Sequence, residues 1–208
     1  CLTRLADDPD PKVKLELMSC LGNYQNPAAA SALGQLIAAN AGDHYMVAAA
    51  MSSLNPGNVF EVLASLINAK AKPDLVRELT GQAVAMGDAD TIDRVLEVAC
   101  APTEGKAGTI DFASLAMALD GLDDRKWPIS RTSDDARRRV ADSIQAARES
   151  ASDESAAVDV RAIAVHLLGR EQDSREADFD LLAELLGPRS PVFVQQQVVS
   201  RLAKINDP

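Results

Sequence analysis

The chain has 208 residues and is 47% hydrophobic, yet only 3% of its residues are aromatic, and its formal net charge at pH 7 is −10. Ala, Leu, Val and Ile supply most of the apolar content, and the alternating pattern of strands is scarce, so the composition predicts an all-α fold. The acidic balance excludes a broadly basic surface of the kind that neutralises nucleic-acid phosphates.

Turn residues divide the first half of the chain into a series of expected helices. Asp10 precedes Pro11, and Asn26 precedes Pro27. This order is typical of a helix start, because the polar side chain caps the first turn and proline lacks an N–H that would have no partner there. Asp88 is expected to cap a later helix in the same way. We expect helices over about 11–21, 27–40, 43 to the break at 55–58, 59–69, 73–87 and 89–100.

The second half of the chain is less regular. Irregular, polar stretches at 101–109 and 123–133 flank a helix expected at 110–122. Beyond them, the expected helices cover about 134–150, 156–169, 175–187 and 191–205.

The expected domain organisation follows from this change in regularity. We predict N-terminal HEAT-like repeats over 1–101, an irregular longer repeat with loops over 102–151, and C-terminal HEAT-like repeats over 152–208. All three parts are expected to form one continuous array.

A valine recurs early in several of the expected helices, at Val13, Val47, Val76, Val160 and Val194. Most of these positions are roughly 30 residues apart, a period typical of paired-helix repeats. The longer gap between Val76 and Val160 has room for further units. One amphipathic helix cannot bury its apolar stripe alone, whereas stacked antiparallel pairs can. The sequence therefore predicts an α-solenoid, or superhelix, of about five to six antiparallel helix pairs.

The chain offers few groups for catalysis or metal binding. His44 stands at a helix start, and His166 is expected at the polar edge of a packed helix; neither belongs to a nucleophile–base signature. Cys20 and Cys100 lie on the apolar sides of their helices, where we expect them to be buried as small hydrophobic residues. The three cysteines show no CxxC spacing. We predict no catalytic residue, no metal ligand and no cofactor in this segment.

Three short stretches match ligand-binding motifs only in part. Residues 88–93 begin like a calcium-binding EF-hand loop, but the twelfth position is Ala99 rather than Glu, so capping by Asp88 explains the pattern better. Residues 105–109 lack the upstream Gly and the Ser or Thr that a phosphate-binding loop places around its lysine. The basic run 137–139 follows two aspartates, and we expect these charges to pair along a solvated helix start.

Trp127, the single tryptophan, is the one residue that the sequence singles out for binding. It stands in a charged, Pro-containing stretch, where it could be an exposed anchor for a partner, since tryptophan is enriched in interface hot spots. The alternative, which we favour, is that Trp127 folds back to cover the gap between two repeats. A second hypothesis for the whole chain is a ligand-binding or enzymatic helical-repeat module with a pocket near residues 101–133.

The repeated unit resembles a HEAT-type repeat. Residues 8–14 through 21–22, and again 158–161 through 167–169, open a helix with Asp or Pro shortly before Val and a basic residue, and close it at Gly. The resemblance covers most of the chain and weakens between 101 and 150. It implies a helical-repeat solenoid, a class of proteins that mostly bind or space other proteins.

A narrower resemblance rests on residues 112–122, followed after the long helix by 160–164 and 167–169. This order is similar to the helical region of large exported planctomycete-type bacterial proteins. Those proteins place a dehydrogenase-like β-propeller upstream and a c-type haem-binding domain downstream. The resemblance implies a helical spacer between redox modules in a periplasmic or cell-surface protein.

The leading hypothesis is therefore a non-catalytic scaffold or protein-interaction solenoid. Because the chain opens at Cys1 and closes on an Asp-Pro turn, we expect it to be a segment of a larger multidomain protein. The expected partners are proteins or neighbouring domains of the same chain, and acidic groups could select a basic partner. We expect no nucleic-acid partner, and no apolar run is long enough to span a membrane.

Overall fold

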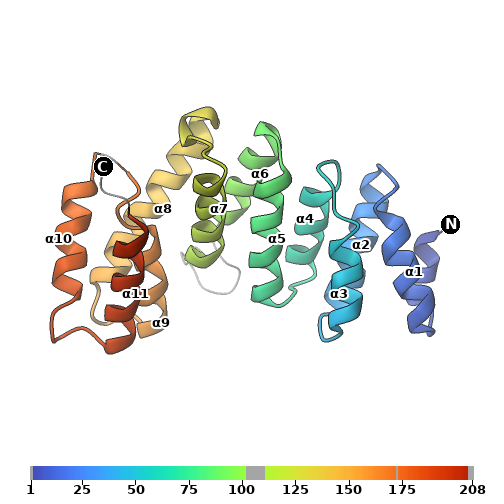
Figure 1. The fold of residues 1–208 in the computed structure, drawn as a ribbon, viewed down its shortest axis with the longest axis horizontal. Helices are drawn as coiled ribbons and strands as arrows, with labels where there is room; N and C mark the ends of the chain where they lie inside the picture. The colour runs from blue at the N-terminus through green and yellow to red at the C-terminus, as the bar shows by residue number, and fades with distance from the viewer. Residues whose placement is uncertain (1, 102–110, 172, 206–208) are drawn as a thin grey trace. The chain divides into compact units, whose positions relative to one another are not determined.

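The computed structural model describes residues 2–101, 111–171 and 173–205, which contain eleven α-helices, three short 3₁₀ helices and no β-strand. The prediction of an all-α fold is confirmed. Figure 1 shows the helices, coloured in chain order from the N-terminus to the C-terminus. Their bounds are α1 (Pro11–Leu21), α2 (Pro27–Ala39), α3 (His44–Met51), α4 (Val59–Asn68), α5 (Pro73–Met86), α6 (Ala89–Ala99), α7 (Phe112–Asp124), α8 (Asp134–Ser152), α9 (Val158–Ala164), α10 (Arg175–Leu185) and α11 (Val192–Lys204). The 3₁₀ helices are η1 (Leu2–Asp7), η2 (Ile129–Arg131) and η3 (Val165–Leu167).

Side-chain caps fix the starts of the early helices. The Oδ1 atom of Asp10 accepts a hydrogen bond from the Lys12 N–H at 2.9 Å, and Asn26 Oδ1 accepts one from the Ala29 N–H at 2.9 Å. Asp43 Oδ1 does the same for the first turn of α3. These bonds satisfy backbone donors that have no partner inside the helix, so the expected starts of α1 and α2 are confirmed.

The chain divides into two compact units. The described residues of Cys1–Val95 and Gly121–Arg131 form unit 1, and those of Leu96–Asp120 and Thr132–Pro208 form unit 2. Each unit is described by itself below.

Unit 1 is built by helices that pack on the next helix but one. In Figure 1, α2 and α4 lie behind α1 and α3, and α1 contacts α3 while α2 runs along α4. Leu33 and Ile37 of α2 and Leu63 and Leu66 of α4 are completely or almost completely buried. Burial of side chains of this size is the main favourable contribution to folding, worth about 1.5–3 kcal/mol each.

A glycine sets the close approach of α2 to α4. A Cβ atom at Gly34 would lie 2.6 Å from Ser65 Cβ and 2.8 Å from the Val62 carbonyl oxygen, closer than two such atoms can come. The Ser65 hydroxyl also donates a hydrogen bond across the same interface to the Ser31 carbonyl at 2.9 Å. The two helices therefore touch through backbone and small side chains.

Unit 2 has its core around α9 and η3. Helix α9 contacts α8 and α11, η3 contacts α11, and α10 packs on both α11 and α8. Leu167 and Leu168 are completely buried there, as are Val194 and Val198 of α11.

The helix expected over 156–169 is shorter than predicted. The α-helix covers Val158–Ala164 and tightens into η3, after which Leu168 is extended with ψ 152° and Gly169 has φ +72°. Glycine adopts such a positive φ readily, so Gly169 marks the end of the helical segment formed by α9 and η3. The prediction extended the helix too far because Leu167 and Leu168 continue the apolar pattern. Both side chains are buried, although the backbone there is no longer α-helical.

The expectation that Cys20 is buried is wrong, because its side chain is exposed. The buried stripe of α1 consists of Leu17, Met18 and Leu21, so that Met18 rather than Cys20 faces the core. Cys100 is buried with 9% of its surface exposed, as expected.

In the described part of the chain, every helix is too short or too polar to cross a lipid bilayer.

Candidate functional site

Trp127 lies half-buried in unit 1, in the turn that leads from α7 to η2. Its backbone N–H donates to the Leu122 carbonyl at 2.9 Å, and Lys126 before it takes a left-handed φ of 52°. The guanidinium carbons of Arg125 and Arg131 lie 5.1 Å and 5.2 Å from the centre of the indole ring. Both cations are within the range of attraction to an aromatic face. Two arginine side chains therefore lie close to the ring.

The same turn is attached to the C-terminal end of α5. Arg125 Nη1 donates to the Gly87 carbonyl at 2.9 Å and also bonds to the Val84 carbonyl, groups that the helix itself leaves without donors. The Trp127 indole N–H is buried and has no hydrogen-bond partner among the described residues. Trp127 thus presents part of an apolar ring and two cations to solvent, and no group that could act as a nucleophile or base.

His166 belongs to a polar cluster in unit 2. Its Nε2 atom lies 2.8 Å from Gln197 Oε1 on α11, and nearby Asp120 accepts from Lys204 Nζ at 2.9 Å and from Arg170. Burial, together with the Lys204 charge, holds the pKa of His166 below its ordinary value. Burial alone would raise the pKa of Asp120, but the bonds from Lys204 and Arg170 lower it instead. This cluster ties η3 to α11 and disfavours the charged form of its histidine.

His44 is exposed at the start of α3. Its ring meets Tyr45 edge-on, with 6.1 Å between the ring centres, and the Tyr45 side chain is 81% exposed. The structure therefore places the two histidines in different surroundings, one exposed at a helix start and one bonded to Gln197. Tyr45 is an exposed aromatic residue that the sequence did not single out, because its outward direction follows only from the packing of α3.

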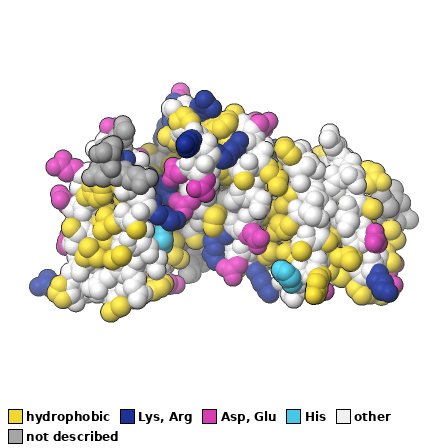
Figure 2. All heavy atoms as spheres, in the orientation of Figure 1, with side chains coloured by type: hydrophobic (Ala, Val, Ile, Leu, Met, Phe, Trp, Pro, Cys, Tyr) yellow, Lys and Arg dark blue, Asp and Glu magenta, His cyan; other side chains and the backbone are white. Residues whose placement is uncertain are grey.

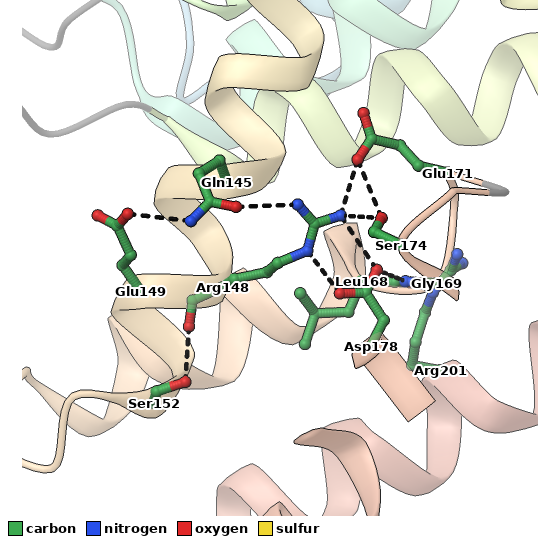
Figure 3. Close-up of polar contacts among 10 residues, drawn as sticks. All are labelled: Gln145, Arg148, Glu149, Ser152, Leu168, Gly169, Glu171, Ser174, Asp178 and Arg201. Carbon is green, nitrogen blue, oxygen red and sulfur yellow. Dashed lines mark hydrogen bonds and ion pairs between the residues drawn. The ribbon is translucent and has the colours of Figure 1, made fainter. Parts of the chain in front are cut away.

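An extended polar network in unit 2 centres on Arg148 of α8 (Figure 3). Asp178 of α10 is completely buried and accepts from Arg148 Nε at 2.6 Å and from the Gly169 N–H at 2.7 Å. Arg148 Nη2 donates to Glu171 at 2.7 Å and also bonds to Ser174. The bond to Asp178 is the main reason that the pKa of Arg148 lies above its ordinary value. All of these groups satisfy one another, so the network is an attachment between helices.

The partial motifs are explained by helix starts. Asp88 Oδ1 accepts from the Thr91 N–H at 3.0 Å, which confirms the capping interpretation. At the start of α8, Arg137 pairs with Asp134, while Arg139 pairs with Asp135 at 2.8 Å, as expected for a solvated helix start. The possible phosphate loop at 105–109 lies outside the described residues.

The described residues offer few features of a ligand site. Within the described residues, no three His, Cys, Asp or Glu side chains gather closely enough to hold a metal ion. An apolar groove of about 320 Å³ lies on α1 and η1, lined by Leu5, Lys12, Val13, Glu16, Leu17 and Cys20.

One contact recurs along the chain. A side-chain donor on one helix or turn reaches the backbone carbonyl of a residue 33 to 35 positions earlier in the chain. The pairs are Ser53 to Met18 at 2.8 Å, Asn55 to Gly22 at 2.9 Å, Ser65 to Ser31 at 2.9 Å and Arg201 to Leu168 at 2.7 Å. The first three lie in unit 1 and the last in unit 2.

Comparisons of this chain with protein families, with curated proteins and with solved structures found no match.

Proposed function

We propose that this chain is a HEAT-like α-solenoid of about five to six helix pairs that serves as a non-catalytic scaffold or protein-interaction surface. The observation that carries the proposal is the recurrent hydrogen bond from a side chain to a carbonyl 33 to 35 residues earlier. A bond with this separation is what successive, similarly placed helix pairs would make. The stacking of α1 on α3 and of α2 on α4 supports the same arrangement within unit 1.

The chemistry of the described side chains also favours binding over catalysis. The charged side chains of Arg148 and Asp178 bond to each other and join two helices, and His166 is bonded to Gln197. The exposed aromatic and aliphatic side chains, by contrast, are available for contacts with a partner. Tyr45 is 81% exposed, and Trp127 is half-buried close to two arginines.

We further propose, from the resemblance alone, that the chain is a spacer between a redox domain and a c-type haem-binding domain in an exported protein. Under this proposal the segment itself holds no cofactor. The parent gene tests it directly: a signal peptide upstream and a CxxCH haem-attachment motif downstream are expected. A parent sequence with neither would remove the spacer hypothesis and leave a plain adaptor.

The scaffold hypothesis is tested by cross-linking the full-length parent protein in its own cells, followed by mass spectrometry. The cross-linking reagent can attach to exposed lysines of unit 1, such as Lys12, Lys72 and Lys126. Cross-links from this segment to other domains or to another protein are expected. If all cross-links stay inside the segment, the interaction hypothesis fails.

A further inference from the structure

The hairpin of α10 and α11 in unit 2 carries an exposed face of unusual composition. Leu186 is 41% exposed, Val192 68%, Phe193 49% and Val199 59%. The inward side of α11 is already occupied by Val194, Val198 and Arg201, which are buried. Exposed apolar side chains that gather in one place mark interaction sites on soluble proteins.

An acidic stripe runs along the neighbouring helix. Glu176, Asp180 and Glu184 of α10 are four residues apart and all exposed, so they share one side of the helix. They lie opposite Asp178 and Leu182, which face the core. Figure 2 shows hydrophobic side chains gathered over α10 and α11, with carboxylates along the outer edge beside α10.

The hairpin has four cations, one of which, Arg175, lies partly buried at the start of α10 beside Glu176. Arg201 is buried and donates to the Leu168 carbonyl, and Lys204 pairs with Asp120 on α7. Arg189 is exposed, but it belongs to the turn between the two helices. The outward side of α11 is therefore uncharged from Val192 to Ala203, with Gln196 and Ser200 exposed among its apolar residues, and α10 carries a negative stripe.

We propose that this face of the α10–α11 hairpin binds a basic amphipathic helix of a partner protein. Packed helices lie about 8–10 Å apart, so a third helix laid on α11 would bring its flanking lysines or arginines within reach of the carboxylates on α10. Its apolar side would cover Phe193 and Val199. A helix laid against an apolar surface and held in register by opposite charges is a recurrent mode of peptide recognition.

Charge decides between this partner and other candidates. Anionic lipid surfaces and nucleic acids present phosphates, which the three carboxylates would repel. The inference rests on the proposed interaction function and names one partner chemistry for it.

The test uses a fluorescent peptide of about 14 residues, similar in length to α11, with Leu on one helical side and Lys on the other. The matched control peptide has Glu in place of every Lys. Fluorescence anisotropy with the chain at about 50 mM and 500 mM salt is expected to show binding of the basic peptide only, weaker at high salt.

Three variants locate the site. The double variant F193S/V199S and the triple variant E176Q/D180N/E184Q are each expected to weaken binding by about tenfold or more. The control triple variant E78Q/D90N/E154Q removes three exposed charges elsewhere and is expected to change the Kd by less than about twofold. Circular dichroism verifies that each variant keeps its helices.

Two results would overturn the proposal. In the first, both peptides bind equally well, or the control triple variant weakens binding as much as E176Q/D180N/E184Q. In the second, neither peptide binds, and sedimentation finds a self-associated chain that F193S/V199S dissociates; the face would then belong to a second copy. Cross-links to other proteins away from α10 and α11 would still support the scaffold function, so the two proposals fail separately.

Discussion

Replacement of Asp178 by Ala is expected to destabilise unit 2 strongly. The Asp178 carboxylate is completely buried, and it accepts from Arg148 Nε at 2.6 Å, from Arg148 Nη2 at 3.3 Å and from the Gly169 N–H at 2.7 Å. Its removal leaves the guanidinium of Arg148, whose side chain is only 17% exposed, and a buried N–H without their main acceptor. Removal of one partner of a buried pair costs about 3–5 kcal/mol, so we expect a loss of this size.

Urea unfolding followed by far-UV circular dichroism measures this loss. The matched control is Arg139→Ala, which breaks an ion pair to Asp135 of similar length, at 2.8 Å, between side chains that are 45% and 63% exposed. Exposed pairs contribute little, so the control is expected to move the midpoint far less. The double variant R148M/D178L should recover part of the loss, because an apolar pair leaves no buried charge, although the Gly169 N–H still lacks its acceptor. If Asp178→Ala and Arg139→Ala have equal effects, the buried network does not hold α8 to α10.

Three further predictions concern single side chains. Because the pKa of His166 is lowered in the folded chain, the unfolded chain binds more protons just below pH 6.5, and stability should fall as the pH drops from about 6.5 through the folded pKa; His166→Gln should flatten this part of the urea-midpoint profile, and an unchanged profile would contradict the prediction. Gly34→Ala should lower the free energy of unfolding, measured in urea, by about 1–3 kcal/mol, because the new methyl group collides with Ser65. A rise in the free energy of unfolding would show that α2 and α4 can move apart without cost. Trp127→Phe should be nearly neutral in thermal unfolding, since the buried indole N–H has no described partner to lose, whereas Trp127→Ala should lower the Tm; a large loss for Phe would reveal a hydrogen bond to that N–H.

Local rules predicted the helices well. Asp10 before Pro11 determines a helix start by chemistry within three residues, and the structure has both the cap and the helix where the sequence places them. The side of a helix that is buried is harder to predict, as Cys20 illustrates. It shares a helical period with Leu17, but the position of the neighbouring helices determines whether Met18 or Cys20 faces the core.

Interactions across elements could not be predicted from the sequence. Arg148 and Asp178 are 30 residues apart, and many other charged residues of the chain could have formed such a pair. The exposed face of α11 could not be predicted from the sequence either. Phe193 and Val194 are neighbouring apolar residues that look equally suited to the core, yet Val194 is completely buried and Phe193 is 49% exposed once α11 packs on α9 and η3.

The repeated donors to backbone carbonyls have a consequence for how this sequence can change over time. Ser53, Ser65 and Arg201 each need a particular side chain to donate their bond. Their acceptors are the carbonyls of Met18, Ser31 and Leu168, and every amino acid has a carbonyl. Substitution at an accepting position therefore leaves the bond intact, whereas substitution at a donor removes it. Related sequences are expected to keep the donors and to vary at the acceptors, so a search for relatives would gain most from the positions that give hydrogen bonds.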